Sequence, residues 1–192
     1  MHKTAFTFLM LSFFVAGCVN DGKNSSGLII GSACGDSLGS FNGVAAYYNE
    51  GFNSCVPNRH MSADGYSYGI RWQCVEYVRR YYKIHLNHKM SSRYGNAADY
   101  FRDDIGHGDL NTDRNLKQFQ NNNTEKPKTH DILVFKDLAP PYGHMCIVME
   151  VNNSTVQVIE QNFGARCFRT LGLERNGDNW EISNGCTGFL RK

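Results

Sequence analysis

The sequence predicts an α+β domain in which helical structure comes first and an antiparallel sheet follows. Residues 74–86, CVEYVRRYYKIHL, place apolar and aromatic side chains on one helical face and a Glu76–Arg80 pair on the other. Runs rich in apolar and β-branched residues then predict three strands, at 131–135, 144–151 and 155–162.

The chain begins with a segment that has the layout of an export signal. His2 and Lys3 precede a mainly apolar stretch, residues 5–15, which is too short to span a bilayer because that requires about 20 residues. The next residues, Val-Ala-Gly-Cys ending at Cys18, resemble the bacterial lipobox, whose cysteine is lipidated after cleavage. An ordinary signal cut at another small residue is the alternative. Either way we expect an exported protein.

This interpretation divides the chain into three parts. Residues 1–17 are a lipoprotein signal peptide, residues 18–32 are the lipidated Cys18 with a polar, flexible tether, and residues 33–192 are the domain. We therefore expect a membrane contact through the lipid anchor, on the periplasmic side of the bacterial envelope. Val19 after the cysteine favours the outer membrane over the inner one.

The composition is that of one compact domain. The chain has 192 residues, of which 41% are hydrophobic and 12% aromatic, so it can bury a proper core. Twenty basic and eighteen acidic residues give a net charge of +2, and no block of like charges stands out. This balance argues against nucleic acid as a partner, and we expect a monomer.

The region between the predicted helix and the first strand, residues 87–130, is polar and ends in QFQNNNTEKPKTHD, which is typical of a loop. A short helix over residues 96–103 is predicted inside it. After this region, the turn Asn-Asn-Ser at 152–154 favours a tight hairpin between the last two strands. That hairpin places the partner of His144 near residue 162, so Glu160 and Asn162 are expected beside His144.

The cysteines need an explanation because an exported protein meets an oxidising environment. Seven are present, and six remain if Cys18 carries lipid. Two pairs each flank a glycine-containing region near one end of the domain, and we expect them to form the disulfides Cys34–Cys55 and Cys167–Cys186.

Cys74 and Cys146 remain, and their contexts differ. Cys146 lies in an apolar strand, where a buried thiol is ordinary. Cys74 opens the predicted helix, where free backbone N–H groups and the positive end of the dipole favour the thiolate. A Cys74–Cys146 bridge stays open as an alternative. A zinc site has little support because neither C-x-x-C nor H-E-x-x-H spacing occurs, and we expect no metal and no organic cofactor.

Cys74, His144 and Glu160 together supply the three roles of thiol acyl transfer: a nucleophile, a proton shuttle and a group that fixes the imidazole tautomer. The alternative is a structural thiol with a satisfied strand histidine. The other histidines of the domain lie in loops, at a polar helix end or before a strand, which is usual for solvated or capping histidines: His60, His85, His88, His107 and His130.

Four stretches, WQCVEYVRRYY, HDILVF, GHMCIVMEV and VQVIEQN, resemble the motif series of the CHAP domain, the cysteine- and histidine-dependent amidohydrolase/peptidase family. The resemblance runs over about residues 33–192. Within the family, GDSLGSFNGVAAYYNEG followed by YGIRWQCVEYVRR is most similar to the amidase domain of glutathionylspermidine synthetase/amidase. The resemblance implies a papain-like (NlpC-type) thiol hydrolase fold with N-terminal helices and an antiparallel sheet.

The resemblance also implies roles for particular residues. Cys74 is the nucleophile, His144 the general base and then acid, Glu160 the orienting group and Asn162 a further polar member of the site. The backbone N–H of Cys74, with the Gln73 side chain, is expected to stabilise the oxyanion. A capping or packing role at the helix N-terminus is the alternative for Gln73.

The sequence departs from the family pattern at His130, where a small residue is usual, at Cys146, which lies close to the catalytic histidine, and in having four extra cysteines. These differences bear on substrate and redox behaviour. We expect cleavage of peptidoglycan peptides, given the expected location. The alternatives are a glutathionylspermidine-type amidase, an enzyme gated by a reversible Cys74–Cys146 bridge, and a non-catalytic envelope lipoprotein.

Overall fold

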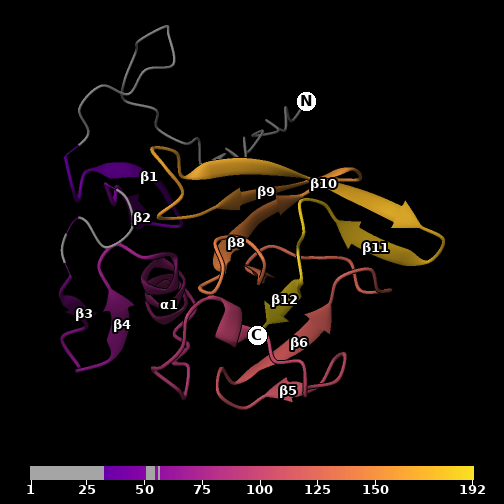
Figure 1. Ribbon diagram of the computed structural model, residues 1–192, viewed down its shortest axis with the longest axis horizontal. Helices are drawn as coiled ribbons and strands as arrows, with labels where there is room; N and C mark the ends of the chain where they lie inside the picture. The colour runs from indigo at the N-terminus through magenta and orange to yellow at the C-terminus, as the bar shows by residue number, and fades with distance from the viewer. Residues whose placement is uncertain (1–32, 51–54, 56) are drawn as a thin grey trace, which may run out of the picture.

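The computed structural model describes residues 33–50, 55 and 57–192. The described chain opens with two antiparallel hairpins, formed by β1 (Ser37–Phe41) with β2 (Val44–Tyr47) and by β3 (Arg59–Met61) with β4 (Ser67–Ile70). Within these residues the one α-helix is α1 (Cys74–His85), and a 3-10 turn, η1 (Ala98–Tyr100), follows it. Figure 1 shows α1 between the β3–β4 hairpin and the main sheet.

The main sheet has eight strands in the order β11-β10-β9-β8-β7-β12-β6-β5, and every neighbouring pair is antiparallel. The sheet curls into a half-barrel (Figure 1). Its strands are β5 (Leu110–Asn111), β6 (Leu116–Gln120), β7 (Ile132–Phe135), β8 (His144–Val151), β9 (Thr155–Ile159), β10 (Phe168–Asn176), β11 (Asn179–Ile182) and β12 (Gly188–Arg191).

Two hydrophobic clusters lie on opposite faces of this sheet. Side chains alternate along a strand, so in β7 Ile132 and Val134 join the first cluster while Leu133 and Phe135 join the second. The first cluster includes the apolar face of α1, and the second contains side chains from strands β6 to β12. The helix is therefore fixed against the sheet, which holds its N-terminus in a defined place beside β8.

The predicted helix and strands are confirmed, with β9 ending at Ile159 and not at residue 162. The expectation of N-terminal helices is wrong, because the described residues before α1 form two hairpins. In the first hairpin Asn42 and Gly43 adopt φ of 49° and 77°, the left-handed pair that a two-residue turn requires.

The prediction of a loop over residues 87–130 is also incomplete. Strand β6 lies within it and pairs with β5 and β12. The predicted helix at 96–103 is reduced to η1. Strand β6 pairs with β12, about seventy residues further along the chain. The local composition of β6 therefore gives little indication of this distant partner.

His130, the residue that departs from the family pattern, has a φ of 79°. Glycine adopts this left-handed conformation without steric cost, which explains why a small residue is usual there. The His130 side chain is held by the Tyr81 hydroxyl at 2.8 Å from its Nδ1, and its carbonyl accepts a bond of 2.6 Å from the Tyr82 hydroxyl. Both tyrosines come from α1, so the turn is anchored to the helix.

Candidate active site

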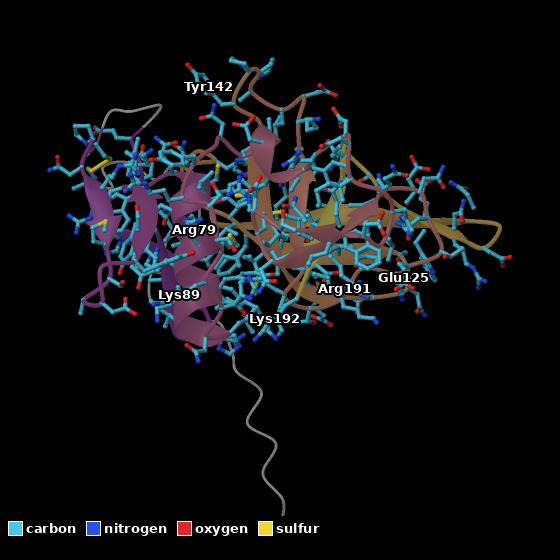
Figure 2. The ribbon with its side chains drawn as sticks, turned by 90° about the horizontal axis from the view of Figure 1, so that it is seen from below. Arg79, Lys89, Glu125, Tyr142, Arg191 and Lys192 are labelled. Carbon is cyan, nitrogen blue, oxygen red and sulfur yellow. A yellow bond between two sulfur atoms is a disulfide. The ribbon has the colours of Figure 1, made fainter. Side chains whose placement is uncertain are left out.

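A cleft of about 1060 Å³ opens at the start of α1. Cys74 and His144 both line it, together with Gln73 and Val75 on either side of Cys74. The remaining lining comes from residues 48–50, the β3–β4 hairpin, residues 93–97, the loop before β8 and residues 162–164. Figure 2 shows Tyr142, from the loop before β8, at the edge of the molecule beyond the start of α1.

Cys74 is the first residue of α1 and is 7% exposed. The preceding residue, Gln73, is extended at φ −78° and ψ 158°, and its carbonyl accepts the first helical bond from the Tyr77 N–H. The Gln73 side chain makes no capping hydrogen bond, so the capping alternative for this residue is wrong. N–H groups of a first helical turn have no acceptor within the helix, and with the dipole they favour negative charge at the Cys74 sulfur.

His144 lies at the start of β8 and contacts Cys74 and Glu160, the two residues expected to act with it in catalysis. Its Nε2 donates to Glu160 Oε2 at 2.9 Å, and its exposed fraction is 4%. The Cys74 side chain forms a hydrogen bond with the same imidazole, which leaves Nδ1 as the nitrogen that meets the thiol. The pairing of β8 with β9 reaches only Ile147 opposite Ile159, where β9 ends, so the structure does not pair residue 162 with His144. Within the sheet His144 lies opposite Phe135 of β7.

The surroundings raise the pKa of His144 to about 9. Burial alone lowers this pKa, because a charged imidazole is costly away from water. The hydrogen bonds to Cys74 and Glu160, and the negative charge on both, more than offset the burial. The imidazole is therefore protonated at neutral pH, in contact with a sulfur that can carry negative charge.

Arg169 on β10 holds the other side of the Glu160 carboxylate, a role that the sequence analysis missed. Its Nη2 donates to Glu160 Oε2 at 2.9 Å, and its Nε lies 2.9 Å from Oε1. The guanidinium also lies over the rings of Phe163 and Phe135, at 4.6 and 5.2 Å from their centroids. The carboxylate is thus fixed between an imidazole and a guanidinium. No local motif marks an arginine nine residues beyond the glutamate.

Asn162 and Gln73 form a hydrogen bond with each other. Asn162 was expected beside His144, but within the described residues it makes no hydrogen bond to that histidine. Asn162 Nδ2 donates to Gln73 Oε1 at 2.7 Å, and Asn49 Nδ2 donates to Asn162 Oδ1 at 2.9 Å. All three amides line the cleft. Asn162 adopts a φ of 62°, which turns the chain out of β9. Asn49 was not predicted as a site residue. Its hydrogen bond with Asn162 joins two residues that are 113 positions apart in the sequence.

A buried polar network lies beneath the start of α1. The predicted Glu76–Arg80 pair is confirmed at 2.6 Å, but both residues are buried, at 0% and 4% exposure, and do not lie on a solvated face. Glu76 also contacts His60 Nδ1 at 2.7 Å and accepts a bond from Gln161 Nε2 at 2.7 Å. Gln161 further donates to the Gln73 carbonyl at 3.0 Å. These bonds tie the N-terminus of the helix to the segment that carries Glu160.

The cysteines divide differently from the expected pattern. Cys34 and Cys55 form the expected disulfide, with 5.4 Å between their Cα atoms. The expected Cys167–Cys186 disulfide is wrong. Cys167 packs in the cluster that contains α1, whereas Cys186 packs in the cluster on the opposite face of the sheet, so the sheet separates their side chains.

The Cys74–Cys146 bridge is not formed in the structure. Cys74 belongs to the first cluster and Cys146 to the second. Burial raises the pKa of the Cys146 thiol well above its ordinary value, which disfavours the thiolate there. The two cysteines therefore occupy different environments, one at the cleft and one in the core.

The signal peptide, Cys18 and most of the tether lie outside the described residues. In the part of the chain that is described, no helix is long and apolar enough to cross a membrane. Over the same residues, histidine, cysteine, aspartate and glutamate side chains form no group of three or more that could hold a metal ion.

Comparison with known proteins agrees with the geometry of the cleft. The sequence model of the CHAP domain matches residues 63–162, a segment that contains Cys74, His144 and Glu160. Glutathionylspermidine synthase of Crithidia fasciculata is 35% identical over 100 residues, which are 50% of this chain. The matched part is 14% of that protein's length, so the chain is similar to a small portion of it.

Proposed function

The chain belongs to the CHAP domain family, whose members are generally amidases and peptidases, and we propose that it hydrolyses an amide bond through a thioester on Cys74. The observation that carries this proposal is the contact of the His144 imidazole with Cys74 on one side and Glu160 on the other. A thiol, an imidazole and a carboxylate in this order are the groups that thiol acyl transfer needs.

In the first step, the Cys74 sulfur attacks the carbonyl carbon of the scissile amide and a C–S bond forms. The carbonyl electrons move onto the oxygen. The proton on His144 Nδ1 then passes to the leaving nitrogen as the C–N bond breaks, which releases an amine and leaves a thioester. Because the pKa of His144 is raised to about 9, this proton is present at neutral pH.

In the second step, a water molecule attacks the thioester carbonyl while His144, now neutral, accepts its proton. The C–S bond breaks, the acid product leaves, and the Cys74 sulfur regains its negative charge beside the imidazolium. Glu160 stays bonded to Nε2 throughout, which keeps Nδ1 as the nitrogen that transfers the proton. The reaction thus needs no change in the ionisation of Glu160.

The negative charge on the carbonyl oxygen is stabilised by the backbone N–H of Cys74 and by the Gln73 side chain. The Gln73 Oε1 atom accepts a bond from Asn162, which orients the amide whose Nε2 is the donor. This arrangement supports an oxyanion role for Gln73 and a positioning role for Asn162.

We propose peptidoglycan peptides as the substrate. The family acts on peptide-type substrates, and an exported protein anchored by lipid at Cys18 would meet the cell wall. The cleft of about 1060 Å³ is wide enough for a branched peptide. Glutathionylspermidine is the second candidate, favoured by the 35% identity with glutathionylspermidine synthase over 100 residues.

Product analysis by mass spectrometry tests the function. The full-length protein, purified in detergent, is incubated with peptidoglycan fragments and separately with glutathionylspermidine. Cys74→Ala should abolish cleavage, whereas Cys146→Ala, which removes a buried thiol of the second cluster, should retain it. Cleavage of the polyamine conjugate alone would replace the first substrate by the second. Absence of cleavage of either, with the Cys74 thiol shown to be free, would favour a non-catalytic envelope protein.

The proposed anchor has its own test. Cys18→Ala should release the protein from the membrane fraction while leaving its hydrolytic activity in place. Membrane association that persists in this variant would contradict lipidation at Cys18, and a soluble wild-type protein would contradict it as well.

A further inference from the structure

Two arginines line the cleft without an acidic partner. Arg59 is exposed on β3, where its backbone pairs with Ile70, and within the described residues its side chain makes no hydrogen bond or ion pair. Arg93, in the segment between α1 and η1, makes its polar contact with a neighbour, its Nη2 donating to the Tyr94 hydroxyl at 2.7 Å. Some arginines elsewhere in the described residues are paired with carboxylates, for example Arg80 with Glu76 and Arg191 with Asp131. Others, such as the buried Arg79 and Arg114, donate to backbone carbonyls.

The Arg93 side chain is held in place before any ligand arrives. Its guanidinium lies 4.9 Å from the centroid of the Tyr94 ring, and the same tyrosine accepts its hydrogen bond. Tyr94 is 63% exposed and also lines the cleft. A guanidinium stacked on a ring in this way loses less freedom when it binds an anion, and its remaining donors stay available.

The charge of the lining favours an anion. Among the described residues that line the cleft, Glu50 carries the acidic side chain, against Arg59, Arg93 and a protonated His144. Glu50 forms no ion pair with either arginine within the described part of the chain. A concave surface with an excess of positive charge concentrates anionic ligands, and the planar fork of arginine matches a carboxylate through two parallel bonds.

We propose that Arg59 and Arg93 form a carboxylate-binding subsite, so that the enzyme selects amide substrates that carry a free carboxylate near the scissile bond. The proposal rests on the proposed function for the identity of the ligand, because a peptide amidase meets carboxylates more than other anions. It adds a requirement that the catalytic residues do not impose, namely a negative charge on the substrate. Both proposed substrates satisfy that requirement, since stem peptides and the glutathionyl group contain carboxylates.

The test measures binding and not turnover, so it does not depend on hydrolysis. The full-length Cys74→Ala protein is titrated by calorimetry with the tripeptide L-Ala-γ-D-Glu-L-Lys and with the same peptide whose carboxylates are converted to carboxamides. Glutathione and its diethyl ester form a second pair of probes. We expect at least one acid probe to bind roughly tenfold more tightly than its neutral form, because a hydrogen bond between charged groups is worth that factor or more.

Arg59→Gln and Arg93→Gln, each added to the Cys74→Ala protein, should remove this preference while leaving the affinity for the neutral probe unchanged. Both side chains are exposed, so the fold should tolerate the changes. Arg175→Gln, at an exposed arginine on β10 outside the cleft lining, is the matched control and should keep the preference.

Three outcomes would overturn the subsite: equal affinity for acid and neutral probes in the Cys74→Ala protein, no binding of any acid probe, or a preference that survives in both arginine variants. Each of these differs from a failure of the proposed function. That failure would be seen as absence of Cys74-dependent cleavage in the product analysis, whatever the binding experiment gives.

Discussion

His144 Nε2 lies 2.9 Å from Glu160 Oε2, and this bond between two almost fully buried side chains decides which nitrogen of the imidazole meets Cys74. With Nε2 held by the carboxylate, Nδ1 is left to exchange the proton with the substrate. Arg169 restrains the same carboxylate from its other side. The imidazole and its carboxylate are therefore held by three neighbouring strands, β8, β9 with its extension, and β10, while the start of α1 supplies the thiol and the backbone N–H groups beside it.

The raised pKa of His144 predicts how the rate depends on pH. In the proposed mechanism the imidazolium donates the proton to the leaving amine, so kcat/KM should fall as the pH rises through about 9, where that proton is lost. Glu160→Gln removes a negative charge that raises this pKa, so the alkaline limb should move to lower pH and kcat/KM should fall by roughly 100-fold or more.

A pH–rate profile of wild type and Glu160→Gln checks this expectation. Glu150→Gln, at an exposed position on the same strand as His144, should leave both the rate and the alkaline limb unchanged. An alkaline limb that stays near pH 9 in Glu160→Gln would show that this carboxylate does not control the imidazole.

The environments of the thiols predict a strong difference in alkylation. Burial raises the pKa of Cys146 well above its ordinary value and that of Cys186 to about 12, so both should be almost entirely protonated at pH 7.5. Cys74 instead lines the cleft, where a reagent can reach it, and contacts the protonated imidazole of His144.

Iodoacetamide should therefore modify Cys74 at least about tenfold faster than either buried cysteine. Peptide mapping by mass spectrometry over a time course measures the three rates in one sample of folded protein. His144→Ala removes the protonated partner and should slow the reaction of Cys74 alone. Equal rates for Cys74 and Cys146 in folded wild type would contradict an activated thiol.

The sequence predicted the part of the site that rests on local signals. Helical periodicity after Cys74 and a hairpin register that brings His144 toward Glu160 are both short-range features, and both are confirmed. Asn42-Gly43 is also a strong local hairpin signal, and attention to it would have predicted β1 and β2 in place of N-terminal helices.

The remaining features depend on contacts between distant parts of the chain. Asn49, just after β2, reaches Asn162 across 113 residues, and Cys167 and Cys186 pack in clusters on opposite faces of the main sheet. Disulfide pairing follows three-dimensional distance, which the spacing of cysteines in a sequence does not determine. Arg169 was missed for the same reason, since it meets Glu160 across the pairing of β9 with β10.

Gly143, the residue before His144, should tolerate no side chain. Its φ is 71°, and an added Cβ would lie 2.7 Å from the backbone nitrogen of Ala98, which donates a bond of 2.9 Å to the Tyr142 carbonyl. Gly143→Ala should cost about 3 kcal/mol of unfolding free energy and reduce activity, because the loop that positions His144 must move. Chemical denaturation and product assays measure the two effects.

Gly177→Ala is the matched control for that variant. Gly177 has a similar φ of 64°, but an added Cβ meets nothing within 4 Å. It should cost only about 1 kcal/mol, the price of the backbone conformation, and leave activity unchanged. Equal effects of the two substitutions would show that the contact with Ala98 does not matter.

Arg191, which is labelled in Figure 2, forms an ion pair with Asp131 that should stabilise the fold away from the active site. Arg191 Nε and Nη2 lie 2.9 and 2.8 Å from the two carboxylate oxygens of Asp131, which is 1% exposed. Arg191→Met leaves a buried carboxylate without its cation and should lower the free energy of unfolding by about 3 kcal/mol at pH 7. Chemical denaturation of the variant and wild type measures this difference.

The penalty should depend on pH in a definite direction. Burial already raises the pKa of Asp131, although Arg191 acts against it, and loss of the arginine should raise it further. A group whose pKa is raised in the folded state becomes neutral there first as the pH falls, so the difference between variant and wild type should shrink toward pH 5. Arg175→Met, which removes an exposed pair with Asp178, should change the stability by less than about 0.5 kcal/mol at either pH. A constant penalty for Arg191→Met across this range would mean that lost packing of the arginine, and not the unpaired carboxylate, causes the destabilisation.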